Sequence, residues 1–477
     1  MHISNSLSYK HLFKGSAIYG SADVIVAIVR FLLIAVYTRI LSPAEFGLYA
    51  ILTTSLMLAN VFIPLGIPSA VMLKLGEKKS LDKSVEKDSA FIFLFLLCIV
   101  CGVLFFILSQ FGGPKYLFKN LTLWLILYIS SDVLSAIPKV SLRLHENIRG
   151  FNTAKILRVF AMAILLLILV KNGVRGITAI IIAEASATFL ELTVCMVIDN
   201  FLPFRFSFFP ILPLLRVGLP LTMIGFGIVC IDLSDRYVVS SILGTQANGF
   251  YAAAAKIAVA ASFFAEAFNS MWFPYFLRIT AKSNFGITED MQRFSKRLIV
   301  LFAAAISFLI LVLPCLVDIK IAGKEFVARQ YHEVSVLIGP LVLAYFFKIV
   351  FYISSAALIA QKKSRPLVII VYCAALVNIG GDIFVAFHFG GRNVFFVLSI
   401  IALMTSVAYA ICMVCVAKVA GMFPYRFWAL SPYVWTSFLC LTLAFLPIPL
   451  FARIACLSLI CAGFFVKSFL IPRSAAG

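Results

Sequence analysis

Residues 89–111 read SAFIFLFLLCIVCGVLFFILSQF, a run without a single charged side chain. It exceeds the roughly 20 residues that an α-helix needs to cross the hydrocarbon core of a bilayer. Similar stretches recur along the 477-residue chain, which is 63% hydrophobic and has a mean hydropathy of +1.07. A water-soluble protein could not cover so much apolar surface, so the sequence predicts an integral membrane protein.

Fourteen stretches are predicted to cross the membrane. They must be α-helices, because lipid offers no partner for open backbone groups. The predicted spans are 18–41, 46–73, 89–111, 116–142, 156–170, 174–198, 211–243, 249–277, 298–317, 334–360, 367–389, 394–419, 427–445 and 450–471. The sequence therefore predicts an all-α fold, in which no loop is long enough to hold a second folded domain.

Most of the positive charge lies in short loops between these spans, since the chain has 40 Lys and Arg against 20 Asp and Glu. The loops at 74–87, 139–158 and 278–297 are the basic ones, and the positive-inside rule places them and both termini in the cytoplasm. Topology and attraction to anionic membrane lipids account for the net charge of +20, so we expect no nucleic-acid partner. Residues 1–15 are predicted to be a cytoplasmic segment that can form an interfacial helix.

Two segments of the chain repeat each other. Residues 40–50 read ILSPAEFGLYA after the first span, and residues 242–252 read ILGTQANGFYA after the seventh. Each is a tight outer turn that leads into a helix start. Because six spans separate them, the repeat is parallel, about an axis along the membrane normal. We therefore predict a first lobe at 16–200, a second lobe at 201–420, and two appended helices at 421–477.

Basic side chains inside apolar spans are the main indication of function. Arg30, Arg236, Lys256 and Lys348 lie within predicted spans, where an ionisable group is costly and usually faces water or a partner. Their positions predict a cavity for an anionic substrate. Lys256 and Lys348 have no carboxylate one turn away, so they either form bridges between helices or await an anion.

Acidic residues accompany two of these cations. Asp23 shares a helix face with Arg30, and Asp232 is four residues before Arg236, with Asp235 beside it. These pairs are interpreted either as self-neutralising salt bridges or as groups that take up H⁺ or Na⁺. Three further acids within predicted spans, Glu184, Glu191 and Asp382, are interpreted as helix-packing or interface positions.

Three residues interrupt the second predicted span, namely Pro64, Gly66 and Pro68. Proline removes a backbone hydrogen bond and bends a helix. The interruption predicts either a static kink or a gating hinge.

Catalytic and cofactor motifs were sought and none was found. The five histidines form no metal pair, the chain has no phosphate-binding GxxxxGK[ST] loop, and no Ser/His/Asp arrangement follows from spacing. We predict no enzyme activity, no metal and no cofactor. Any driving force must then come from an ion gradient, a partner or the gradient of the substrate.

The sequence resembles a known family of membrane proteins. The stretch Arg39-Ile40-Leu41-Ser42-Pro43-Ala44-Glu45-Phe46-Gly47-Leu48-Tyr49 is similar to the first-turn signature of the polysaccharide exporters in the multidrug/oligosaccharidyl-lipid/polysaccharide superfamily. Residues 249–256, GFYAAAAK, are similar to the counterpart of that signature in the eighth helix. Fourteen spans, a six-plus-six repeat and two added helices agree with the same family.

This resemblance implies a function. Its nearest members are O-antigen and capsule flippases of bacterial inner membranes, which move undecaprenyl-diphosphate-linked oligosaccharide from the inner to the outer leaflet. It implies a multi-pass location in that membrane, lipopolysaccharide biosynthesis as the setting, and a polysaccharide polymerase and chain-length machinery as partners. A diphosphate would bind Lys and Arg. The alternatives are an ion-coupled multidrug antiporter, a lipid II flippase, or a membrane sugar polymerase or transferase.

Overall fold

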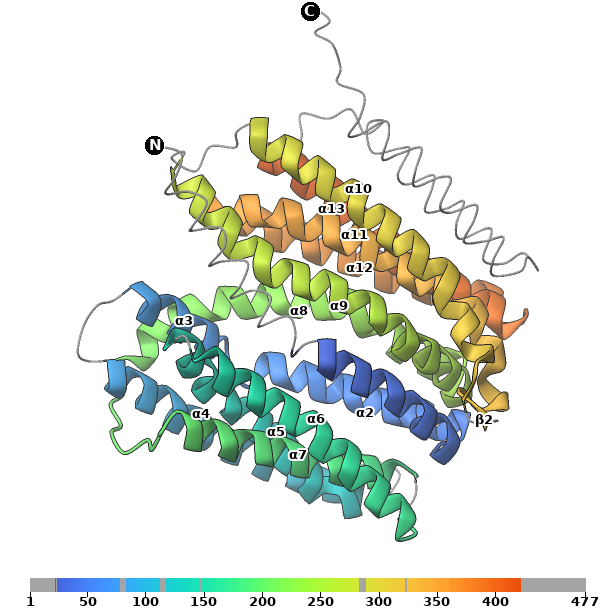
Figure 1. Ribbon diagram of the computed structural model, residues 1–477, viewed down its shortest axis with the longest axis horizontal. Coiled ribbons are helices and arrows are strands. Elements are labelled where there is room, and N and C mark those ends of the chain that lie inside the picture. Colours follow the sequence, from blue (N-terminus) through green and yellow to red (C-terminus); the bar gives the residue numbers. More distant parts are fainter. Residues whose placement is uncertain are drawn as a thin grey trace, which may run out of the picture. The chain divides into compact units, whose positions relative to one another are not determined.

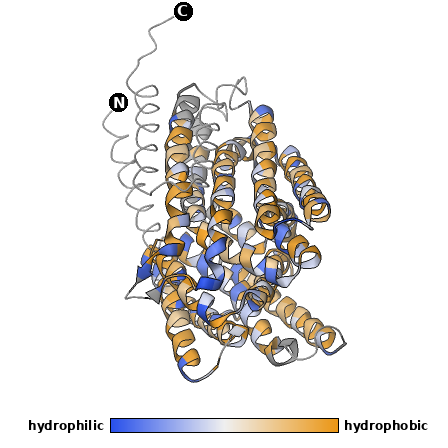
Figure 2. Ribbon diagram, turned by 90° about the vertical axis from the view of Figure 1, so that its right-hand side faces the viewer, coloured by the Kyte–Doolittle hydropathy of each residue, from blue (hydrophilic) through white to orange (hydrophobic). Residues whose placement is uncertain are grey.

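The computed structural model describes residues 22, 24–77, 83–111, 117–145, 147–174, 176–282, 289–321, 324–361 and 363–421. Over these residues the fold is helical apart from one antiparallel pair of short strands, β1 (Lys320–Ile321) and β2 (Lys324–Glu325). Ten helical segments of the described part are long and apolar enough to cross a membrane, and Figure 2 shows helices that are orange over most of their length. The predicted all-α membrane class is confirmed. The count of fourteen stays a prediction, because the ten segments do not include the first and eighth predicted spans and the last two predicted spans lie outside the described residues.

The helices follow one another along the chain with short connections (Figure 1). Residues 24–40 are helical. The labelled helices are α2 (Pro43–Phe62), α3 (Ile67–Glu77), α4 (Lys83–Phe111), α5 (Leu117–Leu144), α6 (Ile148–Lys171), α7 (Gly176–Ile198), α8 (Ile211–Ile242), α9 (Thr245–Lys282), α10 (Glu289–Val312), α11 (Ser335–Ala360), α12 (Ser364–Phe389) and α13 (Val394–Ala420). Two short 3₁₀ helices, η1 (Leu313–Asp318) and η2 (Arg329–Val334), lie between α10 and α11.

The fifth predicted span is longer than expected. It was placed at 156–170, whereas α6 begins at Ile148. The Oδ1 atom of Asn147 accepts a hydrogen bond from the backbone N–H of Gly150 at 3.0 Å and caps this start. The polar first turns were missed because hydropathy detects the apolar part of a helix and not its capped, polar end.

The second predicted span is broken rather than bent. Helix α2 ends at Phe62 and α3 begins at Ile67, with a turn between them in which Leu65 and Gly66 have positive φ values of 50° and 69°. A Cβ atom on Gly66 would overlap the backbone of Gly218, so only glycine allows this close approach. Pro68 lies in the first turn of α3, where its missing N–H is tolerated.

Contacts divide the chain into two compact units. Unit 1 holds the residues up to Leu33 together with Leu52–Val229, and unit 2 holds Ile34–Ile51 together with the residues from Cys230 onward. The division into lobes at residue 200 stays a prediction. Residues around Gly218 pack on the turn before α3, and the turn before α2 packs on the start of α9. Spatial neighbours therefore cross the sequence boundary that the repeat suggested.

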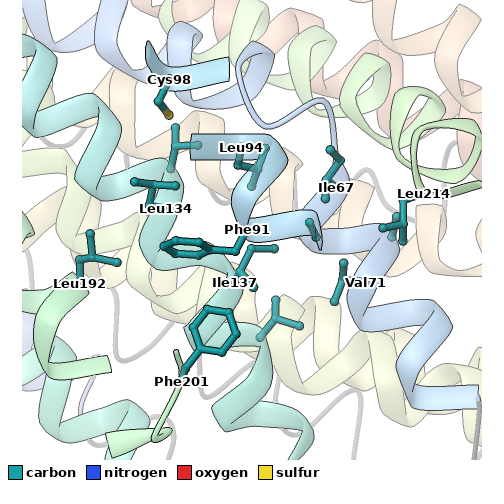
Figure 3. Close-up of a cluster of buried hydrophobic side chains, with 14 residues drawn as sticks. Ile67, Val71, Phe91, Leu94, Cys98, Leu134, Ile137, Leu192, Phe201 and Leu214 are labelled. Atoms are coloured by element: carbon teal, nitrogen blue, oxygen red, sulfur yellow. The ribbon is translucent and has the colours of Figure 1, made fainter. Parts of the chain in front are cut away.

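Unit 1 contains a buried apolar cluster between α3, α4, α5 and the segment that follows α7 (Figure 3). Phe91 and Phe201 meet edge to face there, with ring centroids 5.3 Å apart. Ile67, Leu94 and Ile137 are fully buried around them. Lipid is as apolar as these side chains, so close van der Waals packing is what holds such helices together in a membrane.

Helix α11 is the centre of unit 2. It packs against α9, α10 and α13, and 83% of the most apolar window of this span is buried. A helix that is apolar on every side and covered by neighbours on every side belongs in a bundle core. Its one charged residue, Lys348, is consequently carried into that core.

The two repeated segments touch each other reciprocally within unit 2. A Cβ atom on Gly47 would overlap the carbonyl oxygen of Thr245, and a Cβ atom on Gly249 would overlap the carbonyl oxygen of Pro43. The Nδ2 group of Asn248 also donates to the carbonyl of Gly47 at 2.9 Å. Pro43 and Thr245 are equivalent in the repeat, as are Gly47 and Gly249. Each glycine thus makes the contact that its counterpart makes.

Candidate functional site

Lys348 lies at the centre of an ion cluster in unit 2. Its Nζ atom is 2.8 Å from Oδ2 of Asp232 on α8 and 3.3 Å from Oε1 of Glu266 on α9. Two tyrosine hydroxyls donate to the same carboxylates: Tyr409 to Asp232 at 2.6 Å and Tyr352 to Glu266 at 2.9 Å. Of the two alternatives for Lys348, the structure thus contains the bridge between helices.

The cluster has more negative than positive charge, because one ammonium faces two carboxylates. Lys348 itself is 5% exposed, whereas the side chains of Asp232 and Glu266 are 27% and 52% exposed. A buried lysine needs such partners, since an unpaired charge in an apolar core is very costly. The half-exposed acids can lose their partner and still be solvated. An anion could reach Lys348 only by displacing them.

The other predicted cations occupy different surroundings. The ammonium of Lys256 lies 4.8 Å from the ring centroid of Tyr37 and 4.9 Å from that of Tyr49, within the range of cation–π attraction. The backbone N–H of Arg236 donates to Oδ1 of Asp235 at 2.8 Å. Arg30 belongs to unit 1, where it is exposed. Asp23 lies outside the described residues.

Asp235 is buried and belongs to a second polar group in unit 2. It accepts a short hydrogen bond from the hydroxyl of Tyr251 on α9. Asp382 on α12 is close enough to repel it electrostatically. Asn378, one turn before Asp382, donates to the carbonyl of Ile231 at 3.2 Å and so ties α12 to α8.

Several oxygen atoms in this second group have no partner. Among the described residues, neither carboxylate oxygen of Asp382 has a hydrogen-bond partner, although the residue is fully buried. The same holds for Oδ1 of Asn378 and for the hydroxyls of Thr405 and Ser406 on the neighbouring α13. Buried polar atoms are almost always satisfied, so the unpartnered carboxylate of Asp382, one turn from the unpartnered Oδ1 of Asn378, needs an explanation.

The donor set of this group suits a small hard cation. Carboxylate, amide and hydroxyl oxygens are the ligands of such ions, while soft thiolate and imidazole ligands favour transition metals. In the part of the chain that the structure describes, no three His, Cys, Asp or Glu side chains are arranged to hold a metal ion. Asn378 and Asp382, which we call the orphan-oxygen group, and the neighbouring Asp235 are therefore candidates for binding Na⁺ or a proton.

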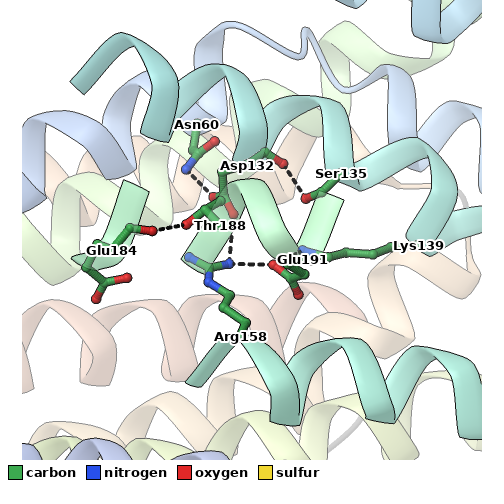
Figure 4. A network of polar contacts seen from close by, with 8 residues as sticks. All are labelled: Asn60, Asp132, Ser135, Lys139, Arg158, Glu184, Thr188 and Glu191. Carbon is green, nitrogen blue, oxygen red and sulfur yellow. Dashed lines mark hydrogen bonds and ion pairs between the residues drawn. The ribbon is translucent and has the colours of Figure 1, made fainter. Parts of the chain in front are cut away.

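Unit 1 buries a charge network of a different kind (Figure 4). The NH1 group of Arg158 on α6 donates to Asp132 at 2.9 Å and to Glu191 at 2.8 Å. Lys139 is 2.8 Å from the same oxygen of Glu191, and Asn60 donates to the other oxygen of Asp132 at 2.6 Å. Two cations thus face two carboxylates, and these side-chain bonds link α2, α5, α6 and α7.

Sequence reasoning found some of these residues and missed others. The packing interpretation agrees with the place of Glu191 in the unit 1 network, but it does not account for the unpartnered Asp382. Arg30 belongs to unit 1, and within unit 2 Lys256 and Lys348 have separate partners, so a shared role for the predicted cations stays a prediction. Arg158, Tyr352 and Tyr409 were not singled out, although the place of Arg158 inside the predicted span 156–170 is a signal that could have found it.

The fold is similar to that of several solved membrane proteins. A structure titled "Lipid II flippase MurJ, inward closed conformation" is similar over 96% of this chain and 100% of its own, with a TM-score of 0.73 and 15% identity. The Vibrio cholerae MATE transporter VcmN has a TM-score of 0.64 at 13% identity, over 89% of this chain and 99% of its own. The eukaryotic MATE transporter AtDTX14 has a TM-score of 0.57 at 13% identity, over 91% and 99%. At this identity the likeness establishes the fold, which is that of multi-pass flippases and transporters.

The family follows from the sequence. Residues 12–280, more than half of the chain, match the family described as "Polysaccharide biosynthesis protein". The chain therefore belongs to the polysaccharide biosynthesis protein family, as the resemblance of its first-turn signature predicted. No curated protein matches it in sequence.

Proposed function

We propose that this protein is a flippase that moves undecaprenyl-diphosphate-linked oligosaccharide, an O-antigen or capsule repeat unit, from the inner to the outer leaflet by alternating access. The observation that carries the proposal is the family match over residues 12–280 in a chain with the fold of a lipid II flippase. Such a protein works in a bacterial inner membrane with both termini in the cytoplasm. It supplies a polysaccharide polymerase and its chain-length machinery.

The substrate is expected to bind through its diphosphate. Arg30, Arg236 and Lys256 are proposed to form charge-assisted hydrogen bonds with it. Lys348 is proposed to join them only after Asp232 and Glu266 release it, because they hold it at 2.8 and 3.3 Å. Competition between substrate and carboxylates for one ammonium would then reset the carrier. The break at Pro64, Gly66 and Pro68 is proposed as the hinge.

A cation gradient is proposed to drive the cycle. The orphan-oxygen group supports this, since its buried carboxylate and amide oxygens have no hydrogen-bond partner and are the kind of oxygen ligand that hard cations take. Asp235 and Asp382 would take up Na⁺ or H⁺. A membrane potential contributes about 2.3 kcal/mol per charge per 100 mV, which is enough to bias such a cycle.

The proposal is tested by transport in liposomes. Purified protein is reconstituted and offered lipid-linked oligosaccharide, lipid II and a cationic dye in parallel. Movement of the oligosaccharide alone supports the proposal. Movement of lipid II or of the dye instead would establish one of the two alternatives from the same superfamily.

The binding residues are tested in cells that lack the native gene. Arg30→Ala, Arg236→Ala, Lys256→Ala and Lys348→Ala are expected to lower export at unchanged abundance. Lys171→Ala, at the exposed end of α6, is the matched control and should export normally. Normal export by all four variants would contradict the proposed cationic binding site. It would not contradict the transport proposal, which the liposome assay tests separately.

A further inference from the structure

The connector between α7 and α8 has an unusual surface. Residues 201–209 read FLPFRFSFF, are not helical, and lie between the membrane spans that end at Ile198 and begin at Ile211. Large apolar side chains project from it. Their exposed fractions are 61% for Leu202, 82% for Phe204, 48% for Phe206, 68% for Phe208 and 88% for Phe209.

The backbone of this connector is held in place by the first residues of α4. Phe201 is buried in the apolar cluster of unit 1, with the ammonium of Lys87 4.5 Å from its ring centroid. The carboxylate of Asp88 accepts backbone hydrogen bonds from Phe204 and Arg205. The hydroxyl of Ser89 accepts one from the N–H of Ser207 at 2.9 Å. The exposure of the phenyl rings therefore comes from a fixed backbone and not from a loosely placed loop.

Fixed, exposed aromatic rings at the end of a membrane span need an apolar neighbour. Such a patch in water would be a liability, whereas amphipathic segments with Phe and Leu lie at the boundary between headgroups and acyl chains. Basic residues accompany the rings: Arg205 within the connector and Arg216 in the first turns of α8 are both exposed. Lys87 and the exposed Arg143 belong to the basic loops that the positive-inside rule assigns to the cytoplasm.

We propose that residues 202–209 bind the cytoplasmic surface of the bilayer as a membrane anchor, with Leu202 and the four phenyl rings between acyl chains and Arg205 on anionic headgroups. The occupant is lipid, because exposed apolar rings flank the exposed guanidinium of Arg205, a combination that suits acyl chains beside anionic headgroups. The anchor holds the connector between the two predicted lobes at the membrane surface. It does not depend on the transported substrate.

Fluorescence quenching in vesicles of phosphatidylcholine and phosphatidylglycerol tests this proposal. The full chain carries a fluorescent amino acid at position 206, or at position 172 in the exposed turn after α6 as a water-facing control. The quenchers are acrylamide in the water and brominated lipids in the bilayer. We expect the label at 206 to be protected from acrylamide relative to 172 and to be quenched by the brominated lipids.

The headgroup contact is tested with two vesicle preparations, in which either the phosphatidylglycerol or the phosphatidylcholine is brominated. Brominated phosphatidylglycerol should quench the label at 206 more than brominated phosphatidylcholine, by up to about fivefold, the factor expected of one basic residue near an anionic surface. Arg205→Glu should abolish that preference. Equal acrylamide quenching at 206 and 172 would overturn the anchor and indicate a protein partner. Equal quenching by both brominated lipids would overturn the headgroup contact. Neither result bears on transport.

Discussion

In unit 1, Arg158 and Lys139 face Asp132 and Glu191, so two partly buried cations meet two carboxylates. In unit 2, Lys348 meets both Asp232 and Glu266, and Asp235 and Asp382 lie buried nearby. A balanced network has little reason to change during a transport cycle. A cluster with surplus acid can gain a cation and lose it again. The difference assigns a structural part to the first region and a working part to the second.

The largest loss of stability is expected in unit 1. Arg158→Met removes the guanidinium from Asp132, which keeps its bond from Asn60, and leaves Glu191 with Lys139, which should lower the free energy of unfolding by about 3–5 kcal/mol. Thermal unfolding of the purified protein in detergent measures this. Arg158→Met with Asp132→Asn is the control, because it removes the unpaired charge and should recover part of the loss. An unchanged unfolding temperature for Arg158→Met would contradict the structural role assigned to the unit 1 network.

Lys348→Met should lower the free energy of unfolding by less, about 1–3 kcal/mol, although Lys348 is itself more buried than Arg158. Its partners Asp232 and Glu266 are 27% and 52% exposed, so water can solvate them once the ammonium is gone. The same unfolding assay ranks the two variants. A greater loss for Lys348→Met than for Arg158→Met would reverse the comparison.

Asp382→Asn should leave stability unchanged or raise it by about 1 kcal/mol, because an unpartnered buried carboxylate is replaced by a neutral amide. The variant should also lose any stabilisation that Na⁺ gives to the wild type. Unfolding temperatures in sodium and in choline buffers measure both effects. Glu191→Gln in unit 1 is the matched control. It should lower the unfolding temperature, but sodium should change that temperature as much as it does in the wild type. A sodium response that survives Asp382→Asn would contradict the cation site.

The smallest effect is expected at an exposed pair. Arg329 donates to Glu325 at 2.9 Å, and the arginine side chain is 85% exposed. Its hydrogen bond holds the pKa of Glu325 below the usual value. This stabilisation is present above the ordinary carboxyl pKa and is lost as the pH falls through the lowered one. Arg329→Gln should therefore leave the unfolding temperature near its wild-type value at neutral pH. A large fall in the unfolding temperature at neutral pH would mean that exposed ion pairs stabilise this protein as much as buried ones.

The sequence predicted the helices better than it predicted their partners. Runs such as 89–111 identify a span by composition, and the signature around Gly47 identified the repeat and the family. The bond between Lys348 and Asp232 joins positions 116 apart in sequence, and helical periodicity reports only neighbours on one helix. Asp382 could not be recognised as unpartnered, because that property depends on what α8 and α13 place around it. The start of α6 was missed for a local reason, since its capped first turns are polar.

The reciprocal contact of Gly47 and Gly249 has a consequence for the origin of the chain. When a surface patch meets its own copy across a two-fold axis, each residue makes the contact that its mate makes, as in a symmetric homodimer. Here Gly47 meets Thr245 and Gly249 meets Pro43, with both copies on one polypeptide. This arrangement is what gene duplication and fusion of a six-helix ancestor that paired with itself would leave behind. In such a molecule, drift at either glycine is restrained by the backbone of the other copy.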